Sequence, residues 1–221
     1  MNIEKKTARG INYLNLALCA FAGLGIEALY AYLLEPAIYG APMARWDDMQ
    51  SICHWIATCA TWGIIALLIV RHAKQKYGFD LFERREKIKT RQWILTAACV
   101  ALVLIVQSLD WNGWKVLHEF YSKGLAKFIF QYIYYFFETV LFTLIIVFGQ
   151  KACEVWFKRE NIPYGGILVA LTWGLAHWAT KGDFFVGLLT AAAGFCFGVV
   201  YLLLNRNIKA TYLMLCVMFI L

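Results

Sequence analysis

Two ionisable residues lie within long apolar runs of the sequence, Glu138 in the run 128–148 and His177 in the run 163–180. Ionisable groups at membrane depth are costly, so they usually face the interior of a helical bundle. If both helices begin at the same membrane surface, Glu138 lies about 15 Å and His177 about 18 Å from it, at 1.5 Å per residue. A carboxylate and an imidazole that share a depth in a low-dielectric pocket can polarise a water molecule. Glu138 would be the general base, and His177 would orient or share the proton.

A structural role is the alternative for an acid inside a membrane, because a carboxyl group can hydrogen-bond to a neighbouring helix and fix the packing. The functional interpretation is favoured for Glu138, which is central in its run. The structural one is favoured for Glu27, in the run 11–34. Together with Gln107 and Gln131, the two acids could instead line a polar path for a small solute.

The elements that must position these residues are membrane helices. Of the 221 residues, 62% are apolar and 16% are charged, a composition outside the range of soluble domains. A bilayer core about 30 Å thick needs roughly 20 apolar residues for each helical crossing. The apolar runs therefore predict an all-α, polytopic integral membrane bundle of six to seven helices in a single domain, 1–221. The predicted crossings are 11–34, 52–70, 93–109, 128–148, 163–180 and 184–204, with a short seventh piece at 210–221.

The distribution of Lys and Arg predicts the orientation of this bundle. The alternate segments 1–10, 71–91, 149–162 and 205–209 hold sixteen of the 21 basic residues. Because Lys and Arg are retained on the cytoplasmic side, the N-terminus is expected in the cytoplasm and the protein in a plasma membrane. Membrane lipid is thus an expected partner, whereas the basic residues form no aromatic-interleaved patch that would predict a nucleic-acid partner. The basic run is interpreted as a lipid-facing anchor, or alternatively as a site for a protein partner: Arg84, Arg85, Glu86, Lys87, Lys89 and Arg91.

An additional helix is predicted in the segment 110–127, on the opposite side. Its apolar residues recur at helical spacing, and its polar residues fall mostly on the other face. This pattern is typical of a helix that lies in the membrane interface, and the alternative is a lid or a docking element for a substrate. The apolar residues are Trp114, Leu117, Phe120, Tyr121 and Leu125, and the polar ones are Lys115, His118, Glu119 and Lys123.

Small residues mark the predicted helix 184–204, which contains the pattern Gly194-Phe-Cys-Phe-Gly198. Small residues at four-residue spacing let helix backbones approach closely. We expect tight packing within the chain, with dimerisation as the alternative.

Two short motifs in the C-terminal half are similar to motifs of a known family. Residues 138–143 read Glu-Thr-Val-Leu-Phe-Thr, and residues 173–177 read Trp-Gly-Leu-Ala-His. Their order and spacing resemble the Glu-Glu-x-x-Phe-Arg and Phe-x-x-x-His motifs of the CPBP family, the CAAX-protease and bacteriocin-processing intramembrane proteases (Abi proteins). Thr139 and Thr143 replace the second Glu and the Arg, and Trp173 replaces the Phe. The resemblance covers roughly residues 128–221 and implies a CPBP-like core there.

The resemblance also implies catalytic roles. Glu138 and His177 would activate water for peptide hydrolysis, while a His-x-x-x-Asn or His-x-x-x-Asp motif in the last helix would stabilise the oxyanion. If Asn207 aligns with the turn before that helix, the last motif falls on Leu215 and Phe219, which carry no polar group. Loss of one oxyanion donor typically lowers the rate about 10²–10³-fold.

Other polar side chains would then have to compensate, and the candidates are Thr139, Thr143, Tyr201 and Asn205. With Phe142 and Trp173, these residues complete the pocket predicted around Glu138 and His177. A zinc ion is implied by the family resemblance alone. A catalytic zinc ordinarily takes three protein ligands plus water, and only Glu138 and His177 are evident.

Three functions follow from these observations. The first is a divergent CPBP-like intramembrane endopeptidase that cuts a peptide or membrane-anchored protein with Glu138-activated water. The second is a catalytically inactive relative that binds a peptide, lipid or membrane partner in an immunity or regulatory role, as the apolar Leu215 and Phe219 favour. The third is a small-solute transporter subunit, although no half-chain repeat with broken helices supports it.

Overall fold

The computed structural model describes residues 9–83 and 86–221, which form helices and short connections without a β-strand. The all-α prediction is confirmed over this part of the chain. Arg84 and Arg85 of the predicted anchor, and the basic segment 1–8, lie outside the described residues. The helices are α1 (Gly10–Leu29), the π-helix η1 (Tyr30–Leu34), α2 (Glu35–Tyr39), the 3-10 helix η2 (Met43–Arg45), α3 (Asp48–Tyr77), α4 (Thr90–Asp110), α5 (Lys115–Lys123), α6 (Leu125–Phe157), α7 (Tyr164–Val169), the π-helix η3 (Ala170–Gly174), α8 (Leu175–Lys181), α9 (Phe184–Leu203) and α10 (Ile208–Ile220).

Five helices of the described chain are long and apolar enough to cross a membrane, which indicates a membrane protein. They are Gly10–Tyr39, Asp48–Tyr77, Thr90–Asp110, Leu125–Phe157 and Phe184–Leu203. Several continue past their apolar runs, because a helix does not end where its hydrophobic residues end. The crossing predicted at 163–180 is one helix in three parts, α7, η3 and α8, and the short seventh piece is α10, with 13 residues.

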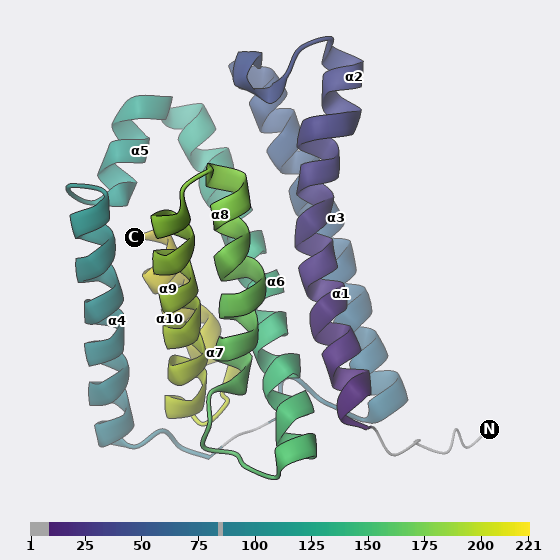
Figure 1. Cartoon of the computed structure of the whole chain (residues 1–221), viewed down its shortest axis with the longest axis vertical. Helices are drawn as coiled ribbons and strands as arrows, with labels where there is room; N and C mark the ends of the chain where they lie inside the picture. Colours follow the sequence, from purple (N-terminus) through teal and green to yellow (C-terminus); the bar gives the residue numbers. More distant parts are fainter. Residues whose placement is uncertain (1–8, 84–85) are drawn as a thin grey trace.

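Helix α6 is the central element of the bundle. It packs against α1, α3, α7 and α10, so that two thirds of its most apolar window, 67%, is buried. In Figure 1, α1 and α3 lie to one side of α6, and α9, α10 and finally α4 lie to the other. Helix α4 lies at the periphery. Only 11% of its most apolar window is buried, and its large apolar side chains face outward. An acid on the inner part of α6 is therefore surrounded by protein.

The connections of the bundle fall at two ends. The start of α1 and the connections α6–α7 and α9–α10 lie at the lower end of Figure 1. The connection α2–α3, helix α5 and the connection α8–α9 lie at the upper end. This arrangement keeps the predicted basic segments within the described chain at the lower end.

Glycines bring α6, α7 and α9 into close contact. A Cβ atom on Gly198 of α9 would lie 2.3 Å from the Cα of Gly166 in α7, and one on Gly165 would lie 2.1 Å from the carbonyl oxygen of Ile146 in α6. No larger residue fits without a backbone shift. The small residues of α9 are thus used for packing within the chain.

Helix α5 turns its charged face inward and its apolar face outward. Lys115 and Glu119 are buried, whereas Trp114, Leu117 and Tyr121 are exposed, Tyr121 to 80%. This is the reverse of a helix on a water-soluble protein, and it agrees with a helix whose outer face lies among lipids.

Candidate functional site

Glu138 lies at the middle of α6 with its carboxyl group buried in the bundle. The side chain is 8% exposed, and Oε1 accepts a hydrogen bond of 2.8 Å from the indole Nε1 of Trp173. Among the described residues this is the hydrogen bond that the structure gives to the carboxyl group. An ionised carboxylate has about four acceptor positions, so Glu138 keeps capacity for further donors.

Trp173 lies on η3, the π-helical part of the helix 164–181. A π-helical turn inserts an extra residue into the helical register and is frequent at functional sites. Here it aims the Trp173 indole at α6. The next turn carries His177, whose Nδ1 lies 2.8 Å from the backbone oxygen of Trp173 and whose ring centroid is 4.7 Å from that of Trp173.

The structure thus places Trp173 in contact with both predicted catalytic residues. Glu138 bonds to its indole nitrogen, and the half-buried His177 packs against its ring and bonds to its backbone. Within residues 9–83 and 86–221, no hydrogen bond or ion pair joins Glu138 directly to His177.

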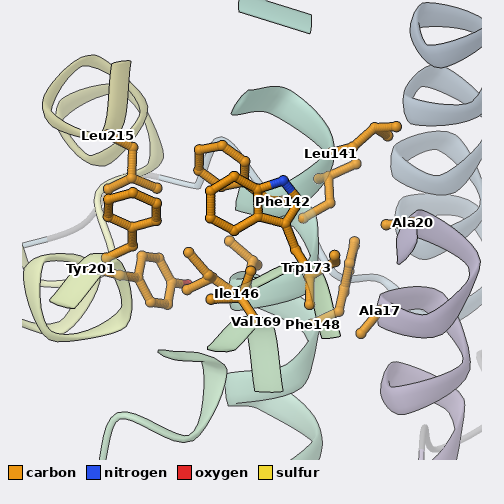
Figure 2. Close-up of a cluster of buried hydrophobic side chains, with 14 of the residues drawn as sticks. Ala17, Ala20, Leu141, Phe142, Ile146, Phe148, Val169, Trp173, Tyr201 and Leu215 are labelled. Carbon is orange, nitrogen blue, oxygen red and sulfur yellow. The ribbon is translucent and has the colours of Figure 1, made fainter. Parts of the chain in front are cut away.

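Aromatic rings enclose this site toward the last helix. The ring of Phe142 lies 4.8 Å from that of Trp173 and stacks on Phe197 at 5.2 Å. From α10, the ring of Phe219 packs at 5.4 Å from Trp173, and Leu215 is fully buried. Figure 2 shows Leu215 on the α10 side of this cluster and Trp173 beside Phe142. Leu215 and Phe219, where the sequence resemblance would place the last polar motif, therefore supply apolar packing.

The other predicted pocket residues have partners of their own. The hydroxyl groups of Thr139 and Thr143 donate to backbone oxygens one turn earlier in α6, those of Tyr135 and Thr139. Asn205 lies at the lower end, where its side chain bonds to Gln92 and to the Lys87 carbonyl.

The remaining pocket residue, Tyr201, lines a polar hollow of about 170 Å³ at the lower end. The hollow also holds the ion pair between Glu154 and Arg206, whose Nη2 lies 2.7 Å from the Glu154 oxygen. Phe142 and Phe197 lie between Tyr201 and the level of Glu138 along their helices. The structure therefore groups Glu138, Phe142, Trp173 and His177, and places Tyr201 and Asn205 elsewhere.

Lys115 joins the site from α5 and was not predicted from the sequence as a site residue. Its Nζ donates to the Phe219 backbone oxygen at 2.9 Å and lies 4.2 Å and 4.7 Å from the ring centroids of Tyr135 and Phe219. Burial lowers the pKa of Lys115 to about 8, although the charges of Glu119 and Glu138 oppose this shift. The sequence signal that could have identified Lys115 is the amphipathic pattern of α5, which places this residue on the polar face.

A second buried acid, Glu119, lies beside Lys115 at the upper end. Its oxygens accept hydrogen bonds from Lys123, Gln131, Tyr132 and Tyr135 at 2.7–3.3 Å. We call these five residues the Glu119 network. Gln131, interpreted from the sequence as part of a polar path, is hydrogen-bonded within the Glu119 network.

Glu27 approaches the site from α1. Its carboxylate is near enough to Glu138 and to the buried Tyr134 to interact with both. It also lies 3.7 Å from Nε2 of His54 in α3. The structural role favoured for Glu27 from the sequence stays a prediction, but its neighbours include the central acid.

A zinc centre would lack a third protein ligand here. Oε1 of Glu138 accepts from the Trp173 indole and Nδ1 of His177 bonds to the Trp173 backbone oxygen, which leaves Oε2 and Nε2 as the two atoms that could bind a metal. In the part of the chain that the structure describes, no three His, Cys, Asp or Glu side chains converge as a metal site.

Comparison of the chain with family models, curated proteins and solved structures gives no match.

Proposed function

We propose that this chain is a CPBP-like membrane protein that binds a peptide, lipid or membrane partner at the Glu138 site without hydrolysing it. An immunity or regulatory role fits such binding. The proposal includes a plasma-membrane location with six or seven crossings and a cytoplasmic N-terminus. The separation of the connections into two ends, with basic segments at one of them, supports that orientation.

The observation that carries the proposal is that Trp173 contacts both predicted catalytic residues, while no hydrogen bond joins Glu138 to His177 within the described residues. Hydrolysis needs a water that Glu138 can deprotonate, and donors aimed at the oxygen on which negative charge develops. Instead the indole N–H of Trp173 bonds to Glu138, and the ring of Phe219 packs on the indole. At the two positions where the resemblance places oxyanion-stabilising residues, the chain has the apolar side chains of Leu215 and Phe219.

Binding remains chemically reasonable because Glu138 is only partly satisfied. A backbone N–H, an amine or a hydroxyl group of a partner could donate to its remaining acceptor positions. Such a bond is strong in a low-dielectric surrounding, and it is available only to a partner that reaches membrane depth.

The test compares purified wild type with Glu138→Gln in detergent, using a library of prenylated and leader-type peptides. We expect cleavage at the same background level for both proteins, and saturable binding of some peptides that Glu138→Gln weakens. Glu154→Gln, which changes a partly buried acid near the end of the same helix, is the matched control and should bind like wild type. Cleavage by wild type that Glu138→Gln abolishes would refute the proposal. Equal binding by wild type and Glu138→Gln would also contradict it.

An active endopeptidase is the second candidate, and the position of Lys115 favours it. This buried cation contacts Phe219, at one of the two positions where the family has polar residues, and it interacts with the charge of Glu138. An ammonium group there could stabilise an oxyanion. If cleavage is found, Lys115→Met should reduce it as strongly as Glu138→Gln does. Undiminished cleavage by Lys115→Met would exclude this role.

A further inference from the structure

His54 is a buried imidazole between two carboxylates, at the upper end of the bundle. Its side chain is 1% exposed, Nδ1 lies 2.6 Å from Oε2 of Glu35, and Nε2 lies 3.7 Å from Oε1 of Glu27. Nε2 is buried and has no hydrogen-bond partner within the described residues. Each ring nitrogen therefore lies near a carboxylate: Nδ1 is within hydrogen-bond distance of Glu35, and Nε2 is farther from Glu27.

The backbone of the first membrane helix makes this arrangement possible. Glu27 and Glu35 are eight residues apart, which in a regular α-helix places them roughly 80° apart around the axis. The π-helix Tyr30–Leu34 lies between them, and its wider turn reduces that offset. Both carboxylates consequently reach the same side chain of α3.

The site is enclosed on its upper side by Trp46. Its ring lies 5.4 Å from the His54 ring and 5.5 Å from that of Tyr39, and its Nε1 donates to the Ala41 oxygen at 3.0 Å. This cover keeps the histidine away from bulk solvent. It also provides a natural spectroscopic probe in contact with the imidazole.

The protonation state of His54 determines whether its ring can donate a hydrogen bond toward one carboxylate or toward both. A carboxylate only accepts, and a neutral imidazole has one N–H donor and one acceptor nitrogen. Neutral His54 can donate to one acid, while its lone pair faces the other. The doubly protonated ring alone presents an N–H and a positive charge toward both Glu27 and Glu35.

We propose that His54, Glu27 and Glu35 form a proton-binding site, separate from the Glu138–Trp173 pair, that holds the upper end of α1–α2 to α3. Glu27 also interacts with Tyr134 and Glu138 of α6. A bound proton on His54 draws Glu27 toward α3 and offsets the repulsion between the acids. Among the described residues, Tyr39 is a further titratable group at the upper end, and it interacts with Glu35, Asp47 and Cys53. This inference does not depend on whether the Glu138 site binds or hydrolyses a partner.

The experiment uses the full-length protein in nanodiscs, labelled with 5-fluorotryptophan and followed by ¹⁹F NMR between about pH 5 and pH 9, where histidines titrate. The Trp46 signal is assigned with Trp46→Phe. Trp111, whose ring lies 6.4 Å from the exposed His118, is the internal control. We expect the Trp46 signal to move with pH, and this movement to vanish in His54→Gln, whereas the Trp111 signal should be the same in His54→Gln as in wild type.

The carboxylates are tested by their effect on the midpoint of that titration. Loss of an opposite charge at close range lowers the proton affinity of a base by about 1–3 pH units. Glu35→Gln should lower the Trp46 midpoint by this amount, Glu27→Gln by less, and neither should move Trp111. A Trp46 signal that is flat in wild type, or a midpoint that neither substitution moves, would overturn the proposal.

Thermal unfolding tests whether the proton holds the helices together. The stability advantage of wild type over His54→Gln should be largest at low pH and should decrease as pH rises through the Trp46 midpoint. A difference that is independent of pH would show that His54 acts only through packing. If His54→Gln does not fold, the wild-type titration and the two Glu→Gln variants still decide the outcome.

Discussion

Two buried acids of this bundle, Glu119 and Glu138, have opposite surroundings although they lie close together along α5 and α6. Glu119 is 3% exposed and accepts four hydrogen bonds, one of them from the Lys123 ammonium group. Glu138 is 8% exposed and, among the described residues, accepts one, from the Trp173 indole. Buried polar groups are normally fully bonded. Glu119 therefore has the surroundings of a structural residue, whereas Glu138 has acceptor positions that the described side chains do not fill, which is the contrast on which the proposed function rests.

The first prediction removes the acid that is fully bonded. Glu119→Ala should lower the free energy of unfolding by about 3–5 kcal/mol, because it removes the carboxylate from the Lys123 ammonium group and the acceptor from the hydroxyl groups of Tyr132 and Tyr135. Unfolding in mixed micelles, followed by circular dichroism, measures this change. Glu160→Ala, at a carboxyl group with 79% exposure, should change stability by less than about 0.5 kcal/mol. Similar stability of Glu119→Ala and wild type would remove the contrast between the two acids.

The second prediction concerns Lys115, which lies between the two acids. Its pKa of about 8 in the folded protein is below the ordinary value of 10.5. Between these values the unfolded chain binds more protons, so stability should rise with pH. One pKa unit corresponds to about 1.4 kcal/mol, which gives a gain of roughly 3 kcal/mol from about pH 8 to pH 10.5. The stability difference between wild type and Lys115→Met should show this gain, whereas parallel pH curves would contradict it.

The third prediction removes the donor of Glu138. Trp173→Phe keeps a ring in place and deletes the N–H, which should lower stability by about 1–3 kcal/mol if the carboxyl group is left unpaired. In a Glu138→Leu background, which offers the indole no acceptor, the same substitution should have a smaller effect, so a double-mutant cycle in mixed micelles isolates the bond. Trp178→Phe, at an exposed ring on the same helix, is the control. Additive effects of Trp173→Phe and Glu138→Leu would show that the bond contributes little.

The smallest effect is expected at Thr143, one of the residues predicted to compensate for missing oxyanion donors. Its hydroxyl group donates to the Thr139 backbone oxygen at 2.6 Å, so it is not directed at Glu138. Thr143→Val should change stability by less than about 1 kcal/mol and should leave peptide binding unchanged. A marked loss of binding, measured with the same peptide library, would return Thr143 to the site.

The sequence by itself determined the helical class, the positions of the long apolar helices and the central place of Glu138. These properties depend on the hydropathy of each segment and on the cost of a charge inside a membrane, both of which are local. The amphipathic pattern also indicated α5, although not that its charged face would contact α6. Motif spacing related Glu138 to Trp173 and His177, but it did not show that the indole of Trp173 would bond to the acid.

Only the tertiary structure decided which polar groups meet. The contacts of Lys115 with Phe219, and of His54 with Glu35, join residues on different elements. They depend on how far each helix is rotated about its axis, and the π-helices η1 and η3 change that rotation where Glu35 and Trp173 are placed. An apolar helix has nearly the same hydropathy on all its sides, so hydropathy cannot show which side faces a neighbouring helix. The physical reason is that lateral pairing inside the membrane is set by packing between helices, which no single segment encodes.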